Sequence, residues 1–227
     1  MKNLLLGCLS LFAFSSQGQM LVLDQLDSSG GAALFRNKVM DKTKERISGS
    51  PFISDDFMAS EVSGAENVWL TRYNAFSDEV EISYDNAIFV IPKDERYQTI
   101  YNKTANYKLQ LMRFNSEKED YIYGYLFELF SNEKMGLYKR EQISLQEGRE
   151  ATNSYSVAQP PKYNRKSAEY YIKLDAEKVI PFPKNKKALI GLYSNNEDAI
   201  SKYLKENKTS FKNEGDLIAL TRFLGSL

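Results

Sequence analysis

The spacing of apolar and polar residues predicts that most of this chain forms β-strands. Residues 79–84 alternate charged or polar side chains with apolar ones at period two, the pattern of a strand with one buried face. The turn dipeptide Asp85-Asn86 joins them to an apolar run at 87–91, so this region predicts a β-hairpin. Residues 107–114 alternate in the same way and predict a further strand.

The most apolar segment after the N-terminal apolar run is predicted as a strand at 121–130. Tyrosines at every second position give it one aromatic face, and Ile122 and Leu126 lie on the opposite face. Because both faces are apolar, we expect a central strand that is covered on both sides or passes between two packed layers. Short polar turns connect it to the strands predicted at 107–114 and 135–144, which indicates an antiparallel meander.

Strands are also predicted on either side of this meander, at 68–73 before it and at 169–174 and 178–182 after it. Residues 147–167 show no periodicity and include Pro160-Pro161. We therefore predict a long exposed loop there, and we regard it as a candidate contact site because long loops in compact domains are often functional.

The apolar period changes to that of a helix near the C-terminus. Helices are predicted at 186–193, after the capping-box spacing Ser194–Glu197, and from Asn213 onward. Amphipathic helices this short are unstable alone, so we expect them to pack on the sheet or on one another.

The predicted fold class is α+β: a mainly antiparallel twisted sheet of about eight strands, curled into a sandwich or half-barrel, with three short C-terminal helices. Within the N-terminal lead-in we expect an edge strand at 21–23 and a short helix at 32–44. The predicted divisions are a signal peptide at 1–18, the lead-in at 19–50, an antiparallel β domain at 51–182 and a helical segment at 183–227 that packs on the sheet.

The N-terminus has the layout of a secretory signal peptide. Lys2 precedes an apolar run at 4–14 and the small residue Gly18 follows it, so we expect cleavage before Gln19 and a periplasmic or extracellular protein. The run is too short for a membrane-spanning helix, which takes about 20 apolar residues. Cys8 stands in lipoprotein-like letters, but too little of the apolar run precedes it, so we interpret it as an ordinary residue of the signal.

After this cleavage the chain contains neither histidine nor cysteine, because Cys8 is its only cysteine. These side chains perform much of the nucleophilic, proton-transfer and transition-metal chemistry near neutral pH, so the composition favours a binding protein over an enzyme. Intramolecular disulfides are excluded. The chain carries 30 basic and 30 acidic residues, a balance that argues against a nucleic-acid-binding protein.

Charge is distributed unevenly along the chain. Residues 49–95 carry ten acidic and two basic side chains, whereas residues 160–190 carry eight basic and three acidic ones. In one interpretation these are solvated faces that attract each other in the fold; in the other, the basic stretch binds an anionic envelope partner such as a lipid head group or polysaccharide. The predicted partner-binding basic patch consists of Lys162, Arg165, Lys166, Lys184, Lys186 and Lys187.

The segments GSPFISDDF at 49–57 and RYNAFSDEVE at 72–81 resemble a group of exported cell-envelope proteins common in Bacteroidetes. Residues 205–218 are similar to the end of those proteins, so the resemblance covers most of the chain after the signal peptide. It implies a bacterial cell-envelope location. No activity is established for that group, so the resemblance implies no functional residues.

The sequence contains residues spaced as in known catalytic sites, but each set also has a structural interpretation. The carboxylates of Asp55-Asp56, Glu79 and Glu81 could serve a glycosidase, yet Glu79 and Glu81 have the period of the solvated side of a half-buried sheet. Ser131 and Lys134 have the spacing of penicillin-binding enzymes but fall in a polar turn. Calcium-loop spacing and a phosphate-binding glycine loop are missing from the sequence. We therefore predict no catalytic residue, no metal centre and no cofactor.

Aromatic residues form a second candidate site. Trp69, Tyr121, Tyr123 and Tyr125 could form a ligand-binding platform for a sugar or line an apolar pocket. The alternative is that these rings pack in the core.

We predict an exported, non-catalytic cell-envelope protein that binds a partner or ligand, either another envelope protein, a lipid or a glycan, and no nucleic acid. The first alternative is a carrier in which the curved sheet encloses a lipid. The second is a carboxylate-dependent hydrolase that acts on glycans. The sequence predicts no transmembrane helix and does not indicate an oligomeric state.

Overall fold

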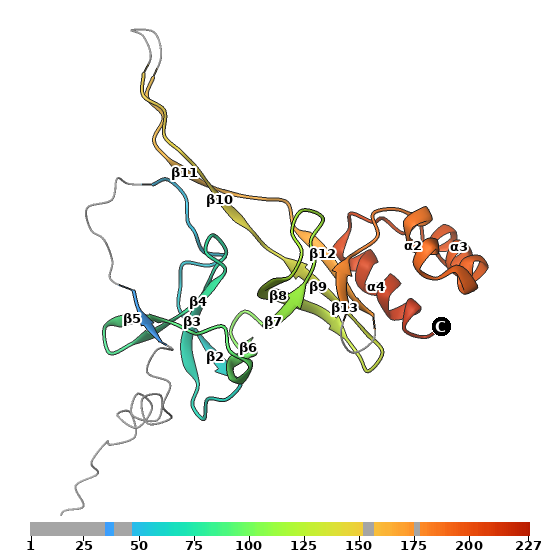
Figure 1. The fold of residues 1–227 in the computed structure, drawn as a ribbon, viewed down its shortest axis with the longest axis horizontal. Helices are drawn as coiled ribbons and strands as arrows, with labels where there is room; N and C mark the ends of the chain where they lie inside the picture. The colour runs from blue at the N-terminus through green and yellow to red at the C-terminus, as the bar shows by residue number, and fades with distance from the viewer. Residues whose placement is uncertain (1–34, 39–46, 152–156, 175–177) are drawn as a thin grey trace, which may run out of the picture. The chain divides into compact units, whose positions relative to one another are not determined.

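The computed structural model describes residues 35–38, 47–151, 157–174 and 178–227, which belong to the unit Phe35–Leu227 (Figure 1). The described part of this unit is α+β, with a large antiparallel sheet and three α-helices at the C-terminal end, and both features confirm the prediction. Within the described residues no helix is both long and apolar enough to cross a membrane.

Among the described residues, the main sheet contains eleven strands in the order β1-β5-β4-β3-β2-β6-β7-β8-β9-β12-β13. All neighbouring pairs in it are antiparallel, and it is open because β1 and β13 form its two edges. β10 and β11 form a separate two-stranded ribbon. The strands are β1 (Arg36–Asn37), β2 (Met58–Val62), β3 (Trp69–Asn74), β4 (Glu79–Tyr84), β5 (Ala87–Val90), β6 (Thr99–Asn102), β7 (Tyr107–Phe114), β8 (Ile122–Ser131), β9 (Met135–Arg140), β10 (Ile143–Gln146), β11 (Lys162–Arg165), β12 (Glu169–Leu174) and β13 (Lys178–Pro181).

Several strands form where the alternating pattern predicts them. β4, β7 and β12 have the predicted bounds, and the meander β7-β8-β9 is antiparallel as expected. Asp85 and Asn86, between β4 and β5, have φ angles of 46° and 59°, the left-handed values of a two-residue hairpin turn. The predicted number of about eight strands is lower than the observed number, because short strands such as β2 and β6 give no long alternating signal.

Two predictions for the ribbon region are wrong. The segment at 135–144 is not one strand, because Glu141 and Gln142 separate β9 from β10. The segment at 147–167 is not a loop throughout, because β11 lies in it and pairs with β10 from Ile143 onward. Regular cross-strand pairing stabilises β11 although its sequence lacks an apolar alternation.

In the lead-in, β1 occupies two residues of the segment predicted as a helix at 32–44, because they pair with the free edge of β5. The prediction of a helix is therefore wrong for those residues. The strand predicted at 21–23 and the signal peptide at 1–18 lie outside the described residues.

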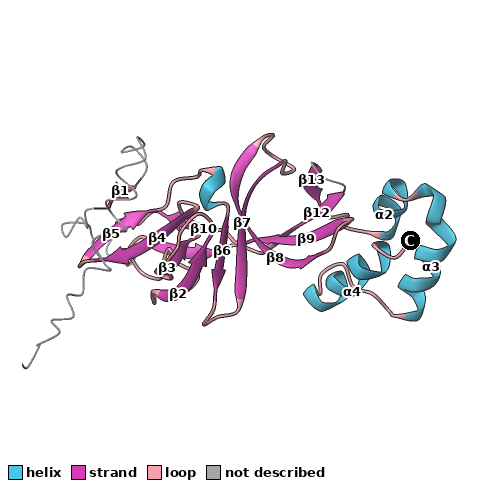
Figure 2. Ribbon diagram, turned by 90° about the horizontal axis from the view of Figure 1, so that it is seen from below, coloured by secondary structure: helices cyan, strands magenta, loops and turns pink. Residues whose placement is uncertain are grey.

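The C-terminal helices are α2 (Lys186–Leu192), α3 (Glu197–Glu206) and α4 (Glu214–Leu224), which lie together in Figure 2. Asn213 caps α4 as predicted, since its side chain accepts a hydrogen bond from the Asp216 N–H at 3.0 Å. The predicted capping box before α3 does not form. Instead, the 3₁₀-helix η2 (Ser194–Asn196) leads into α3, and no side chain caps that helix.

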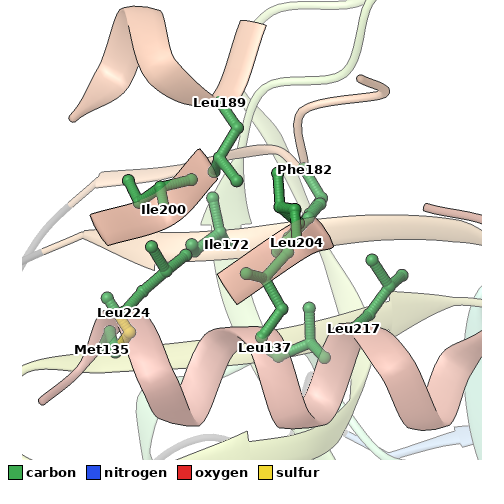
Figure 3. Packing of buried hydrophobic residues seen from close by; sticks show 10 residues of the cluster. Met135, Leu137, Ile172, Phe182, Leu189, Ile200, Leu204, Leu217 and Leu224 are labelled. Carbon is green, nitrogen blue, oxygen red and sulfur yellow. The ribbon is translucent and has the colours of Figure 1, made fainter. Parts of the chain in front are cut away.

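The helices pack on one face of β9 and β12. Leu137 and Ile172 are opposite each other in these strands, and both are completely buried among apolar residues of the helices (Figure 3). Burial of this apolar stripe is what stabilises helices too short to persist alone. The helix residues in this cluster are Leu189, Ile200, Leu204, Leu217, Leu220 and Leu224.

The opposite face of β9 and β12 lines a separate apolar cluster, because this end of the sheet curls. The Asn115 N–H donates to the Val179 carbonyl oxygen at 3.4 Å, so β13 returns to the end of β7 although β8, β9 and β12 separate them in the sheet. Each of the five strands contributes one buried residue: Phe114, Leu126, Tyr138, Tyr171 and Val179.

The other end of the sheet curls toward the opposite face. Tyr125 of β8 points away from its neighbour Leu126, and its ring lies 6.1 Å from that of Tyr73 in β3. β2, β6 and β7 lie between β3 and β8 in the sheet order, so only a curled sheet brings these rings together. Tyr125 and Leu126 are 1% and 0% exposed. The prediction of a central strand covered on both faces is therefore confirmed.

Asp78 joins the β3–β4 turn to the backbone of β8. One carboxylate oxygen accepts hydrogen bonds from the Tyr73 hydroxyl at 2.8 Å and the Tyr125 N–H at 3.2 Å, and the other accepts from Lys93 Nζ at 2.5 Å. The carboxylate occupies the space beside Gly124, where an added Cβ would lie closer than 3.0 Å to Asp78 Oδ2. Gly124 is therefore required by a close approach of two segments.

We expect Gly124→Ala to lower the free energy of unfolding by about 2 kcal/mol, because the new methyl group displaces the Asp78 carboxylate in a packed region. Gly191→Ala in α2 is the matched control, because an added Cβ there meets nothing within 4 Å and alanine favours a helix by up to about 1 kcal/mol. Urea denaturation measures both variants. An equal effect of the two substitutions would contradict this interpretation.

Candidate functional site

A pocket of about 680 Å³ lies between the start of β12, the end of β13, the residues before α4 and the β7–β8 connection. Small-molecule sites have volumes of roughly 300 to 1,000 Å³, so the pocket can hold a ligand of that class. Its lining combines half-buried aromatic rings, a buried apolar floor and charged side chains at the rim.

Local sequence forms the pocket at the point where the β12–β13 pairing ends. The last backbone hydrogen bond runs from the Phe182 N–H to the Tyr170 carbonyl oxygen at 2.8 Å. Pro183 follows, and because proline has no N–H it cannot extend the ladder, so the chain turns away toward α2. Leu217 in the first turns of α4 is 0% exposed and lies at the floor of the resulting space.

Aromatic side chains form the walls. Tyr171 and Phe182 are buried, whereas Tyr170 and Phe211 are half-buried and present part of their rings to the pocket. Half-buried rings of this kind offer flat apolar contact area to a ligand at a low cost in conformational entropy.

The charged rim comes from separate elements. Lys184, after β13, pairs with Glu117 of the β7–β8 connection at 2.7 Å. Glu169 accepts a hydrogen bond from the Tyr171 hydroxyl at 2.8 Å and lies 3.8 Å from Arg140. Lys212 has no ion pair within the part of the chain that the structure describes.

Both tyrosine hydroxyls at the pocket are protonated donors. Burial raises the pKa of Tyr171, and its hydrogen bond to Glu169 raises it further. Burial also raises the pKa of Tyr170, together with the negative charge of Glu214, to which its hydroxyl donates at 3.3 Å. Neither hydroxyl therefore ionises near neutral pH, so both can only orient groups by hydrogen bonding.

The arrangement provides ammonium groups, carboxylates and hydroxyls for binding. Among the described residues that line the pocket, Ser167 is the only aliphatic hydroxyl, and no carboxylate or lysine hydrogen-bonds to it. It thus has no general base beside it in the arrangement of an activated nucleophile. Across the described ranges, no three acidic, histidine or cysteine side chains come together as metal ligands.

The structure divides the predicted basic patch between two places. Lys162 and Arg165 lie on β11 of the ribbon, and Lys166 follows them, with Arg165 paired to Glu141 at 3.1 Å. Only Lys184 lines the pocket. Lys186 and Lys187 are exposed in the first turn of α2, close to Lys184 in the chain.

Sequence reasoning missed Phe211, Lys212 and Tyr170 as pocket residues. Tyr170 reads as one more alternating strand residue, and Phe211-Lys212 lies in a break between two predicted helices. Only the packing of α4 against the sheet brings these residues together, and no local pattern signals it.

The acidic and basic stretches do not pair with each other. Within the described residues, the ion pairs of 49–95 are made inside that stretch or to Arg36, Lys38, Arg96 and Lys103, and those of 160–190 reach only Glu117, Arg140 or Glu141. The interpretation that the two stretches attract each other in the fold thus receives no support from direct ion pairs.

The four predicted platform residues do not share one surface. Trp69 is 8% exposed, and its ring contacts those of Phe35 and Tyr97. Tyr125 is buried against Tyr73, whereas Tyr123 is half-buried under Arg113. Tyr121 precedes β8 and is 87% exposed. Trp69 and Tyr125 therefore contribute to the core in this structure.

Residues 49–57 and the strands of 72–81 pack on each other. Residues 49–57 lie beside the end of β3, where the Ile53 N–H donates to the Tyr73 carbonyl oxygen at 3.2 Å. This segment places the rings of Phe52 and Phe57 at 3.7 and 4.3 Å from the Arg72 guanidinium. The motif therefore builds a cation–π stack on the sheet.

Glu81 is the anion beneath this stack. Its Oε2 accepts hydrogen bonds from Arg72 Nε at 2.9 Å and Nη2 at 2.8 Å, and its Oε1 pairs with Lys38. Glu81 is 0% exposed, so the prediction that it lies on a solvated face is wrong. Residues 49–57 cover Arg72 beside this part of the sheet, which a period-two pattern cannot reveal.

The Glu81 carboxylate is unsuited to act as a general acid. Burial alone would raise its pKa, but hydrogen bonds from Lys38 and Arg72 and the charges of both outweigh burial and lower the pKa. Glu81 therefore stays ionised near neutral pH and has no proton to donate.

Comparison with known proteins finds no match to this chain. No protein-family model matches the chain, and no curated protein or solved structure shows significant similarity to it.

We expect Glu81→Gln to lower the free energy of unfolding at neutral pH by roughly 3 kcal/mol, because removal of one partner leaves buried charge unpaired. Glu79→Gln is the control: Glu79 is partly exposed, and its loss is expected to stay below about 1 kcal/mol.

The same pair of variants has a defined pH dependence. Because the folded state lowers the pKa of Glu81, its contribution is complete above the unfolded value of about 4.3 and is lost as the pH falls through the folded pKa. Urea denaturation at decreasing pH should therefore show the gap between wild type and Glu81→Gln closing. A gap that stays constant into strong acid would contradict this role of the ionised carboxylate.

Proposed function

We propose that this chain is an exported, non-catalytic cell-envelope protein that binds a ligand in the pocket between β12, β13 and α4. Export is supported by the apolar run at 4–14 behind Lys2 and by the small residue before Gln19. The observation that carries the binding role is the pocket itself, with its half-buried rings and charged rim.

The non-catalytic role is supported by composition and by the contacts of the pocket. Histidine and cysteine do not occur after Cys8 in the sequence. The carboxylates of Glu117 and Glu169 are engaged by Lys184 and Tyr171. Groups held in this way suit the recognition of a ligand more than the transfer of a proton.

The lipid-carrier alternative depends on a half-barrel whose interior encloses an apolar ligand. The curl around Tyr125 has that curvature, but the rings of Tyr73 and Phe127 lie 5.6 Å apart there and fill space that a lipid needs. The pocket beside α4 is lined by two lysines and two glutamates, which a hydrocarbon chain would desolvate. Both observations favour a polar ligand over an acyl chain.

A glycan hydrolase remains the second candidate function, because Glu117 and Glu169 line one pocket from different elements. Two carboxylates on opposite sides of a bound sugar are the minimum machinery of that reaction. In the binding proposal no reaction takes place, so neither carboxylate has a catalytic role.

The protein purified from its native envelope fraction should carry its ligand into native mass spectrometry. Ala168→Trp fills the pocket and should abolish the bound mass, whereas Ala105→Trp, in the exposed β6–β7 turn, should retain it. The intact mass also reports the first residue, which we expect to be Gln19 or a close neighbour. Absence of bound mass from the wild type, or equal retention by Ala168→Trp, would overturn the proposal.

A further inference from the structure

We infer that the ligand of this pocket is an acidic saccharide, whose anionic group is bound by Lys184 and Lys212 and whose ring packs on the aromatic walls. The inference rests on the proposed function and specifies its ligand class. The shared chemistry is a carboxylate or phosphate attached to a sugar ring.

Lys184 forms an ion pair that an anionic group of a ligand can replace. Its partner Glu117 is 2.7 Å away, and the two side chains are 72% and 57% exposed. An exposed pair of this kind contributes little stability, so exchanging Glu117 for an anionic group of the ligand costs little. Glu117 thus competes with the ligand for Lys184.

Lys212 supplies positive charge that no partner neutralises within the described residues. The acidic side chains nearby in the chain are engaged elsewhere: Asp216 accepts a hydrogen bond from the Ser210 N–H at 2.8 Å, and Glu214 pairs with Lys139 at 2.9 Å. Lys166 and Lys187 lie one and three residues from the lining residues Ser167 and Lys184 and also lack an ion pair in the described ranges. The local balance therefore attracts an anion.

The walls define the rest of the ligand. The exposed parts of Tyr170 and Phe211 offer flat apolar contact, while the carboxylate of Glu169 offers a polar contact at the rim. A sugar ring has this combination, with C–H groups on its faces and hydroxyls at its edge. A hydrocarbon chain has no group to pair with the lysines, and an inorganic anion alone leaves the aromatic walls unfilled.

Isothermal titration calorimetry with trigalacturonate and its carboxyl-reduced neutral counterpart tests the inference. We expect the acid to bind at least about tenfold more tightly than the neutral trimer, and Lys184→Gln to weaken it about tenfold. Lys103→Gln, which alters an exposed lysine paired with Glu61 outside the lining, is the matched control and should change the affinity less than about threefold.

Glu117→Gln distinguishes a carboxylate that competes with the ligand from one that only forms a structural ion pair. Because the variant removes the competing carboxylate, we expect trigalacturonate to bind about threefold or more tightly, while binding of the neutral trimer stays unchanged. Weaker binding of the acid by Glu117→Gln, or equal affinities of the wild type for the acid and the neutral trimer, would overturn the inference.

Glucose 1-phosphate separates the two sources of the anionic group. Binding that depends on Lys184 supports the inference for a carboxylate, a phosphate or both, according to which probe binds. Neither acid binding would refute the ligand class. If native mass spectrometry then shows a neutral or lipid ligand on the wild type that Ala168→Trp lacks, the pocket stands as the binding site. Equal binding of the acids by wild type and Ala168→Trp refutes the pocket as well.

Discussion

The hairpin of β7 and β8 has to present apolar side chains to both faces of the sheet at once. Tyr125 and Leu126 are neighbours in β8, and each lies in a different core because the sheet curls to opposite sides at its two ends. The approach of the β3–β4 turn to β8 leaves no room for a side chain at Gly124, where the Asp78 carboxylate accepts the Tyr125 N–H. Without any disulfide, the chain depends on this shared hairpin to unite the apolar cores on its two faces.

The pocket follows from the same arrangement. β9 and β12 bury one face against the curl and the other against the helices, so Tyr171 and Tyr170 point to opposite sides of one strand at the edge of the pocket. β13 stops pairing at Phe182, and the chain then crosses from the sheet to α2. Leu217 of α4 closes the remaining side of the pocket. The site is thus positioned by packing of both faces of β12, and its charged rim comes from the connections that packing leaves exposed.

Much of this fold is predictable from sequence and the site mostly is not. Alternation predicts β4, β7 and β12 with their bounds, and two apolar faces predict the central place of β8, because these signals are local. β2 and β6 are too short for a local signal, and they pair with each other although β3, β4 and β5 lie between them in the chain. Charge density singled out Lys184, but Lys212 and Phe211 join it only through packing of α4. Period two placed Glu81 opposite the core, yet the pairing with Lys38 and Arg72 that buries it depends on segments outside that strand.

The shared hairpin makes the two cores one cooperative unit. Urea unfolding followed together by the fluorescence of Trp69, the only tryptophan, and by the far-ultraviolet circular dichroism of the helices tests this most directly. Trp69 in β3 reports the strands that precede the hairpin in the sheet order, and α2, α3 and α4 report the apolar cluster on β9 and β12, which follow the hairpin in that order. We predict coincident transitions with one midpoint for both probes. Two separated transitions would contradict the account, because they would show that one core persists after the other has unfolded.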